Sequence, residues 1–154
     1  MERRLTEEQI TKAILDWLEE QGWEIICYDF PQSGTGISLH PNEELRTTKN
    51  KGAIIPDIVA IKGTTVLFFE NKDRFVLSDF VKVNGLKTGS DYSASLQKLL
   101  KNYNVSQIFY GVGLPKNDNV LNRIAEHQEK IDFAVCVESD KTTTVHFEQT
   151  SMFV

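Results

Sequence analysis

The chain has 154 residues, 40% of them hydrophobic, and a formal net charge of −5. This length and composition suit one hydrophobic core, so we expect a single domain covering residues 1–154. The apolar runs are too short to cross a membrane, and we expect no signal peptide before the first predicted helix. Cys27 and Cys136 lack the spacing of a zinc site. We expect them to be buried thiols of a protein in the reducing cytoplasm.

The first predicted element is a helix over residues 7–21. Thr6 to Gln9 has the capping-box pattern, apolar residues then recur at helical spacing, and Gly22 ends the helix. Hydrophobic patterns and turn residues then predict, in chain order, a strand at 24–30, a polar loop at 31–52, a hairpin at 56–72, a polar loop at 73–90, a helix from Ser90 or Asp91 to Tyr103, a strand at 105–112, a helix at 119–130, and strands at 132–137 and 142–147. The last strand is expected at a sheet edge. A strand–helix–strand crossover predicts parallel strands.

The hairpin is the most informative segment. Residues 58–61 and 64–69 form two apolar runs rich in β-branched and aromatic side chains, and Lys62-Gly63 between them is the predicted turn. Charged residues stand at both ends of these buried runs. Charges at the ends of buried strands need a structural or functional reason.

With this turn, Asp57 lies opposite Phe68 and is a diagonal neighbour of Glu70, with Cα atoms about 7–8 Å apart. Side chains on a strand alternate between faces, so Asp57, Glu70 and Lys72 share one face. Two carboxylates at this distance repel each other unless a cation or a proton lies between them. A divalent ion held by both could activate water at a phosphodiester, and Lys72 could orient the nucleophile or offset charge in the transition state.

At these residues the sequence resembles the PD-(D/E)XK nuclease superfamily, which contains many type II restriction endonucleases, junction resolvases and repair nucleases. The resemblance covers residues 56–72 and consists of Pro56-Asp57 and Glu70-Asn71-Lys72. It implies that Asp57 and Glu70 bind the metal, that the backbone carbonyl of Asn71 also ligates it, and that Lys72 is catalytic. It also implies a restriction-endonuclease-like three-layer α/β fold, a central mixed sheet flanked by helices, with an α-β-β-β-α-β core. One helix and two strands would be additions.

The chain departs from the family on the first helix. Many members carry a metal-approaching Glu eleven residues before the glycine that ends this helix, and here that position is Thr11. Glu7, one turn earlier, lies on the apolar stripe and could reach the site instead, whereas Glu8 points elsewhere. Gln97 on the next predicted helix is a possible additional site residue, because several members place Gln or Lys there. A solvated glutamine is the alternative.

The charge distribution predicts a basic face despite the negative total. Residues 45–101 contain ten Lys and Arg against five Asp and Glu, a local charge of +5. Phosphate contacts supply most of the affinity in DNA binding, so such a segment is suited to DNA. The alternative is an ordinary solvated surface. The candidate DNA-binding residues lie in the two predicted loops: Arg46, Lys49 and Lys51 in the first, and Arg74, Lys82 and Lys87 in the second.

Together these features predict a DNA endonuclease that depends on Mg²⁺, with Mn²⁺ as a possible substitute, most simply of restriction type. Double-stranded DNA is the expected partner. Cutting both strands needs two active sites or two visits by one site, so we expect a homodimer or pairing with a larger recognition subunit. Two alternatives stay open. One is a structure-specific repair or Holliday junction nuclease, and the other is a non-catalytic nucleic-acid-binding module or subunit on the nuclease fold.

Overall fold

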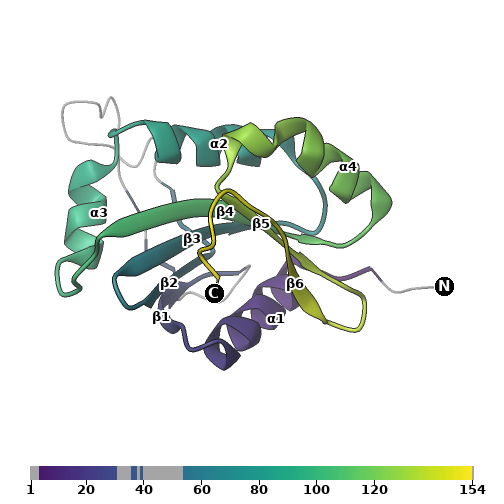
Figure 1. The fold of residues 1–154 in the computed structure, drawn as a ribbon, viewed down its shortest axis with the longest axis horizontal. Coiled ribbons are helices and arrows are strands. Elements are labelled where there is room, and N and C mark those ends of the chain that lie inside the picture. Colours follow the sequence, from purple (N-terminus) through teal and green to yellow (C-terminus); the bar gives the residue numbers. More distant parts are fainter. Residues whose placement is uncertain (1–3, 31–35, 38, 40–53, 154) are drawn as a thin grey trace.

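The computed structural model describes residues 4–30, 36–37, 39 and 54–153. It is an α/β structure in which four helices pack against one six-stranded mixed sheet (Figure 1). The elements in chain order are α1 (Glu7–Glu20), β1 (Glu24–Tyr28), β2 (Ile58–Lys62), β3 (Thr65–Asn71), α2 (Leu77–Thr88), α3 (Ser93–Leu100), β4 (Gln107–Pro115), α4 (Asp118–His127), a 3₁₀ turn (Gln128–Lys130), β5 (Phe133–Val137) and β6 (Thr143–Glu148).

The strands lie in the sheet in their sequence order, from β1 to β6. The pairs β1·β2 and β2·β3 are antiparallel, β3·β4 and β4·β5 are parallel, and β5·β6 is antiparallel at the edge. Each parallel step needs a crossover, and helices supply it: α2 and α3 between β3 and β4, and α4 between β4 and β5. The predicted parallel strands and edge strand are confirmed.

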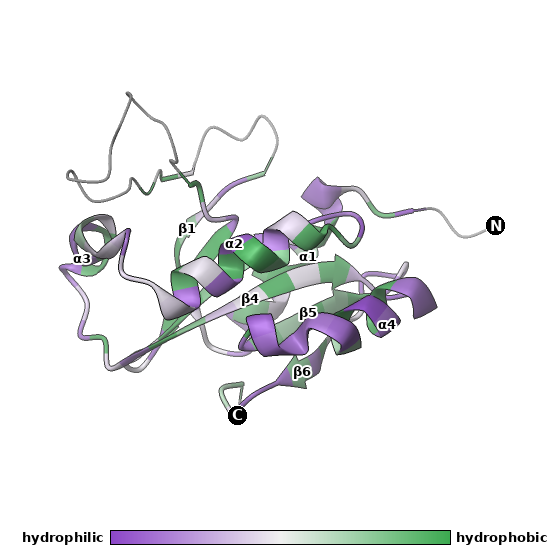
Figure 2. Ribbon diagram, turned by 90° about the horizontal axis from the view of Figure 1, so that it is seen from above, coloured by the Kyte–Doolittle hydropathy of each residue, from purple (hydrophilic) through white to green (hydrophobic). Residues whose placement is uncertain are grey.

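Helices cover both faces of the sheet, which makes three layers (Figures 1 and 2). The helix α1 buries Ile10, Ile14 and Leu18 against one face, as the sequence spacing predicts, and its capping box at Thr6 and Gln9 is formed. On the other face α2, α3 and α4 close a second core. Seen from above, the outer side of α4 is largely hydrophilic, whereas that of α2 is partly hydrophobic (Figure 2).

The prediction of a loop at 73–90 is wrong, because residues Leu77–Thr88 form α2. Asn84 and Gly85 are poor helix formers, and for this reason the sequence pattern indicates a loop. Phe80 and Val83 nevertheless bury themselves against the sheet, and this packing outweighs the low local propensity. The structure therefore has one helix more than the sequence predicts.

The turn of the hairpin is also displaced from its predicted position. Lys62 pairs with Thr65, so the turn residues are Gly63 and Thr64 rather than Lys62 and Gly63. Gly63 has φ +61°, which is the left-handed backbone that a tight hairpin turn requires at its first position. The register shifts by two residues, an even number, and so the faces of all side chains stay as predicted.

Other boundaries differ by a few residues. The strand predicted to reach 30 ends at Tyr28, the helix predicted from Ser90 or Asp91 begins at Ser93, and the strand predicted at 105–112 covers Gln107–Pro115. Cys27 and Cys136 are buried free thiols, as expected. Burial raises the pKa of Cys27 to about 11 and that of Cys136 to about 12. Within the described part of the chain, no helix combines the length and hydropathy of a membrane span.

Candidate functional site

The predicted trio stands where the β2·β3 ladder ends. Ile58 and Phe69 are the last paired residues, so Asp57 and Glu70 are the next positions on the two strands. They are therefore direct neighbours across the ladder, rather than the diagonal neighbours that the sequence predicted. Lys72 follows two residues after Glu70 and continues on the same face. The structure brings all three residues together.

Burial and mutual repulsion define the electrostatics of Asp57. The residue is 8% exposed, and its Oδ2 accepts a hydrogen bond of 2.7 Å from the backbone N–H of Asn71. Burial, followed by the nearby charge of Glu70, raises the pKa of Asp57 to about 8, although the Asn71 hydrogen bond opposes the shift. A carboxyl with this pKa has a strong affinity for a proton or another cation.

Glu70 has a cationic partner from the helix above the sheet. It is also 8% exposed, and the ammonium of Lys82 on α2 donates a hydrogen bond of 3.0 Å to its Oε1. Burial raises the pKa of Glu70, and the charge of Lys82 only partly offsets this. Lys82 was predicted to be a DNA-binding residue on a loop. It lies on the helix α2 rather than on a loop, and its ammonium pairs with a candidate metal ligand.

Lys72 lies between two carboxylates from opposite sides of the sheet. Its Nζ is 3.4 Å from Oε1 of Glu7 on α1 and 4.0 Å from Oδ2 of Asp79 on α2. Burial lowers the pKa of Lys72, but the charges of Asp79, Glu7 and Glu70 outweigh it and raise the pKa overall. The ammonium is thus charged at neutral pH. The geometric expectation that Glu7 reaches the trio agrees with this contact, and Glu8 pairs with Lys12 on the exposed side of α1.

Asp79 is a site residue that the sequence reasoning missed. It is 7% exposed, its Oδ2 accepts no hydrogen bond within the described residues, and burial raises its pKa while Lys72 opposes the shift. It was overlooked because its segment was predicted to be a loop. Phe80 and Val83 carry the signal that could have found it, since their spacing indicates a helix whose buried side would include an acid.

Asn71 connects the site to α1. Its side-chain amide donates a hydrogen bond of 3.2 Å to Oγ1 of Thr11, which is fully buried. Thr11 stands where the resemblance would place an acid on the first helix, and it supplies no carboxylate. Gly113 on β4 leaves space for the Asn71 side chain, because a Cβ atom at Gly113 would overlap Asn71 and Ile14. The side chain of Asn71 therefore lies between α1 and β4.

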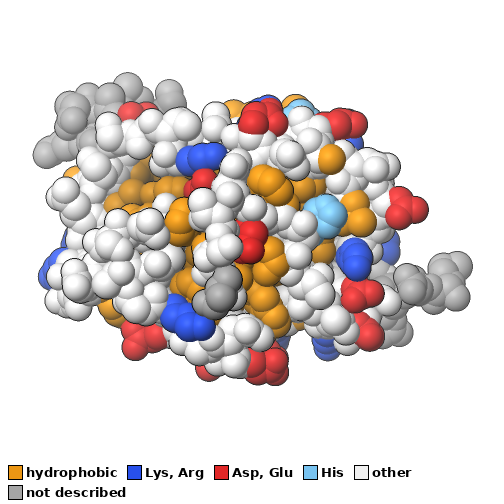
Figure 3. Space-filling model, viewed as in Figure 1, with side chains coloured by type: hydrophobic (Ala, Val, Ile, Leu, Met, Phe, Trp, Pro, Cys, Tyr) orange, Lys and Arg blue, Asp and Glu red, His pale blue; other side chains and the backbone are white. Residues whose placement is uncertain are grey.

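The other predicted residues are not gathered at this site. Lys87 pairs with Asp132 at 3.3 Å, beside the start of β5, and Gln97 is exposed on α3, toward the end of the sheet where β4 begins (Figure 1). Arg74 is close to the site but exposed and paired with Asp73 at 2.7 Å. Arg46, Lys49 and Lys51 lie outside the described residues. On the side of the molecule seen in Figure 3, basic and acidic side chains are interspersed, with no continuous basic area.

A divalent ion of the magnesium type fits the donors that are present. Four carboxylates (Glu7, Asp57, Glu70, Asp79) face two ammonium groups (Lys72, Lys82), which leaves a formal charge of −2 when all are ionised. No three Asp, Glu, His or Cys side chains of the described residues converge closely enough to enclose a metal. Mg²⁺ does not need such a cage, because it is commonly bound by one or two carboxylates and keeps several waters.

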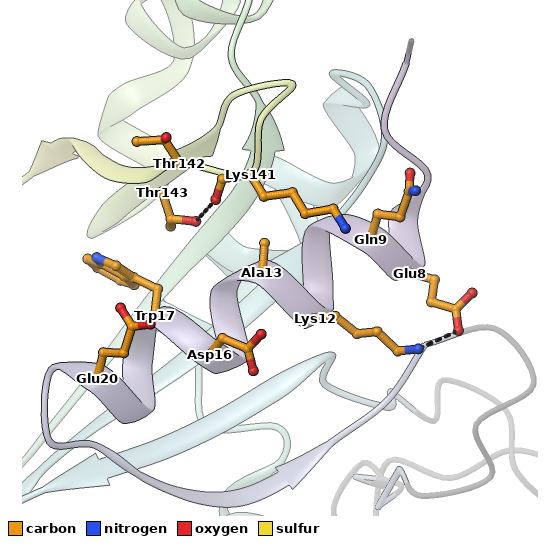
Figure 4. Close-up of a pocket in the computed structure, with 10 residues that line it drawn as sticks. All are labelled: Glu8, Gln9, Lys12, Ala13, Asp16, Trp17, Glu20, Lys141, Thr142 and Thr143. Atoms are coloured by element: carbon orange, nitrogen blue, oxygen red, sulfur yellow. Dashed lines mark hydrogen bonds and ion pairs between the residues drawn. The ribbon is translucent and has the colours of Figure 1, made fainter.

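A cavity of about 660 Å³ lies elsewhere, between α1 and the turn that precedes β6 (Figure 4). Its walls carry both negative side chains (Asp and Glu) and positive ones (Lys), together with Trp17 and two threonines. Lys12 and Glu8 pair with each other at its edge at 3.2 Å (Figure 4). None of the trio lines this cavity. The candidate site is therefore the carboxylate cluster at the ladder end, and not the cavity.

The raised pKa of Asp57 predicts an unusual stability profile. Its folded-state pKa of about 8 lies above the ordinary value of 3.8. Between these values the folded chain binds more protons than the unfolded chain, so this residue makes folding less favourable as pH rises. In chelator, Asp57→Asn should therefore be more stable than the wild type at pH 8.5, by about 1–3 kcal/mol, and the gain should vanish near pH 4.

Urea denaturation at several pH values measures this difference. The Asn side chain can still accept the hydrogen bond from the backbone of residue 71, so the fold should be kept. Asp16→Asn, which removes an exposed carboxylate on α1, is the control for net charge. A stability difference that stays constant between pH 4 and 8.5, or a loss of stability at pH 8.5, would contradict the electrostatic description of the site.

Comparisons with known proteins add no assignment. No protein-family model matches the chain, and no curated protein is significantly similar to it in sequence.

Proposed function

We propose that the chain is a divalent-metal-dependent DNA endonuclease of the restriction-endonuclease-like type, active with Mg²⁺ and with Mn²⁺ as a substitute. The observation that carries the proposal is the pairing of two buried carboxylates, Asp57 and Glu70, at the end of one ladder with Lys72 on the same face. The order of elements from α1 to β4 supports it, because it contains the α-β-β-β-α-β succession that the resemblance implies, with α3 added.

The backbone carbonyl of Asn71 is oriented as a third metal ligand would be, beside Asp57 and Glu70. The N–H of Lys72 donates to Gly113 on β4, and the N–H of Asn71 points the other way, to Asp57. In an extended strand the N–H and C=O of one residue point to the same side. The carbonyl of Asn71 therefore faces the side where Asp57 lies, as a ligand beside two carboxylates would.

The residues divide the chemistry among them. A bound Mg²⁺ would supply Lewis acidity and a water of lowered pKa. Asp57 and Glu70 would hold the ion through their negative charge, and the low exposure of both would keep this interaction strong. Lys72 is charged and is held by Glu7 and Asp79, so it serves to offset the charge that develops on the phosphate rather than to accept a proton.

Incubation of the purified chain with DNA tests the proposal. With Mg²⁺, phage-genome DNA should be cut, and chelator should stop the cutting. Discrete bands would indicate a restriction enzyme, and cutting of branched DNA alone would indicate a junction nuclease. If neither Mg²⁺ nor Mn²⁺ supports cutting of linear, supercoiled or branched DNA, the endonuclease proposal fails. DNA binding without cutting would then favour a binding module or subunit.

The same preparation tests whether Arg46, Lys49 and Lys51, which lie outside the described residues, contact DNA. Substituting the three together should weaken DNA binding and lower the salt dependence by a slope of roughly 0.9 for each phosphate contact that is lost. A homodimer, or a complex with a larger recognition subunit, remains the proposed arrangement for cutting both strands.

A further inference from the structure

Lys82 contacts one of the two carboxylate oxygens of Glu70, the proposed metal ligand. Its ammonium nitrogen is 3.0 Å from Glu70 Oε1 and donates a hydrogen bond to it. Glu70 is buried, so its carboxylate has few other ways to be neutralised without a metal. An ammonium and a divalent cation on the same carboxylate repel each other strongly at such distances. The two cations therefore compete for Glu70.

A second acceptor for Lys82 lies one turn away on the same helix. Asp79 precedes Lys82 by three residues on α2, a spacing at which side chains of a helix meet. Asp79 Oδ2 is buried and accepts no hydrogen bond within the described residues, and its ion pair with Lys72 is long, at 4.0 Å. The charge of Lys82 already acts on Asp79. The side chain of Lys82 is 35% exposed, so it has room to move.

We propose that Lys82 is an exchangeable counter-ion of the site: it neutralises Glu70 in the metal-free protein and moves to Asp79 when Mg²⁺ binds. The inference rests on the proposed function, since it takes Glu70 as a metal ligand. It concerns how the affinity of the site for Mg²⁺ is controlled. In the metal-free protein the lysine offsets part of the negative charge of the two buried carboxylates. The same lysine weakens metal binding, so the site fills only when Mg²⁺ is abundant enough to displace it.

A double-mutant cycle on Mg²⁺ affinity tests the exchange. Lys82→Met keeps the length of the side chain and removes its charge, and it should tighten Mg²⁺ binding by roughly 10-fold in titration calorimetry. Asp79→Asn should weaken binding by roughly 5-fold, because the displaced lysine then loses its new partner. In the Lys82→Met background, Asp79→Asn should change the affinity by less than about 2-fold.

The coupling between the Lys82 and Asp79 substitutions in Mg²⁺ affinity distinguishes exchange from a simple effect of charge. If Asp79 acted only through its negative charge, Asp79→Asn would weaken Mg²⁺ binding equally in both backgrounds, and the proposal would be overturned. Arg74→Gln is the matched control, because Arg74 is an exposed cation near Asp79 that does not contact Glu70. It should alter the affinity by less than about 2-fold.

A crystal structure of the wild type with Mn²⁺ gives a second, independent readout. The Lys82 ammonium should lie within hydrogen-bond distance of Asp79 and away from Glu70. If Mn²⁺ is bound and Lys82 still contacts Glu70, the exchange is overturned while the endonuclease proposal stands. If the wild type binds neither Mg²⁺ nor Mn²⁺ at all, the proposed function fails, and the exchange fails with it.

Discussion

Replacing Asp57 or Glu70 by alanine should abolish measurable Mg²⁺ binding and lower DNA cleavage by roughly 10³-fold or more, because these two buried carboxylates are the proposed ligands of the ion. Both side chains are buried beside each other at the end of the β2·β3 ladder. Each variant keeps only one carboxylate of the pair. One carboxylate binds a divalent ion more weakly than two.

Titration calorimetry with Mg²⁺ and a plasmid-nicking assay measure the two effects, and circular dichroism checks that the variants fold. Glu70→Ala deprives Lys82 of its partner, so Glu70→Gln, which keeps a hydrogen-bond acceptor, is the companion variant. Asp16→Ala, on the exposed side of α1, is the control for the removal of a charge. Wild-type Mg²⁺ affinity in both the Asp57 and the Glu70 variants would refute the site assignment.

The second large effect is expected at Lys72. Lys72→Ala should keep Mg²⁺ and DNA binding but lose strand cutting by about 10² or more, as expected when a fixed charge near the reacting phosphate is removed. The ammonium is paired with Glu7 and Asp79, which come from helices on opposite faces of the sheet.

Gel shift and nicking on one preparation separate binding from chemistry. Lys12→Ala is the matched control, because Lys12 is an exposed lysine on α1 that pairs with Glu8 at 3.2 Å. It should cut DNA at nearly the wild-type rate. Full cutting by Lys72→Ala would show that the lysine has no catalytic part, and loss of DNA binding in that variant would show that it acts by binding instead.

The sequence by itself determined the elements whose signals are local. The capping box at Thr6 and the apolar spacing after it specify α1, and the two apolar runs of the hairpin specify β2 and β3. It also determined that Asp57, Glu70 and Lys72 share a face. That result depends only on the two-residue period of a strand, and a register shift of two residues leaves it unchanged.

The register itself was not decided by the pattern of apolar residues. Lys62-Gly63 and Gly63-Thr64 are both possible two-residue turns, and the choice between them moves Asp57 from a diagonal to a direct neighbour of Glu70. The structure adopts the turn that places Gly63 first, where the backbone has φ +61°. The conformational freedom of glycine at that position was the available signal.

Only the tertiary structure decided that residues of α2 join the trio. The segment of α2 has weak local propensity at Asn84 and Gly85, and it becomes a helix because Phe80 and Val83 pack on the sheet. That packing carries Asp79 and Lys82 to the carboxylates, and it leaves Lys87 beside Asp132. Contacts between residues distant in sequence depend on how the layers pack, and no local pattern of the chain encodes them.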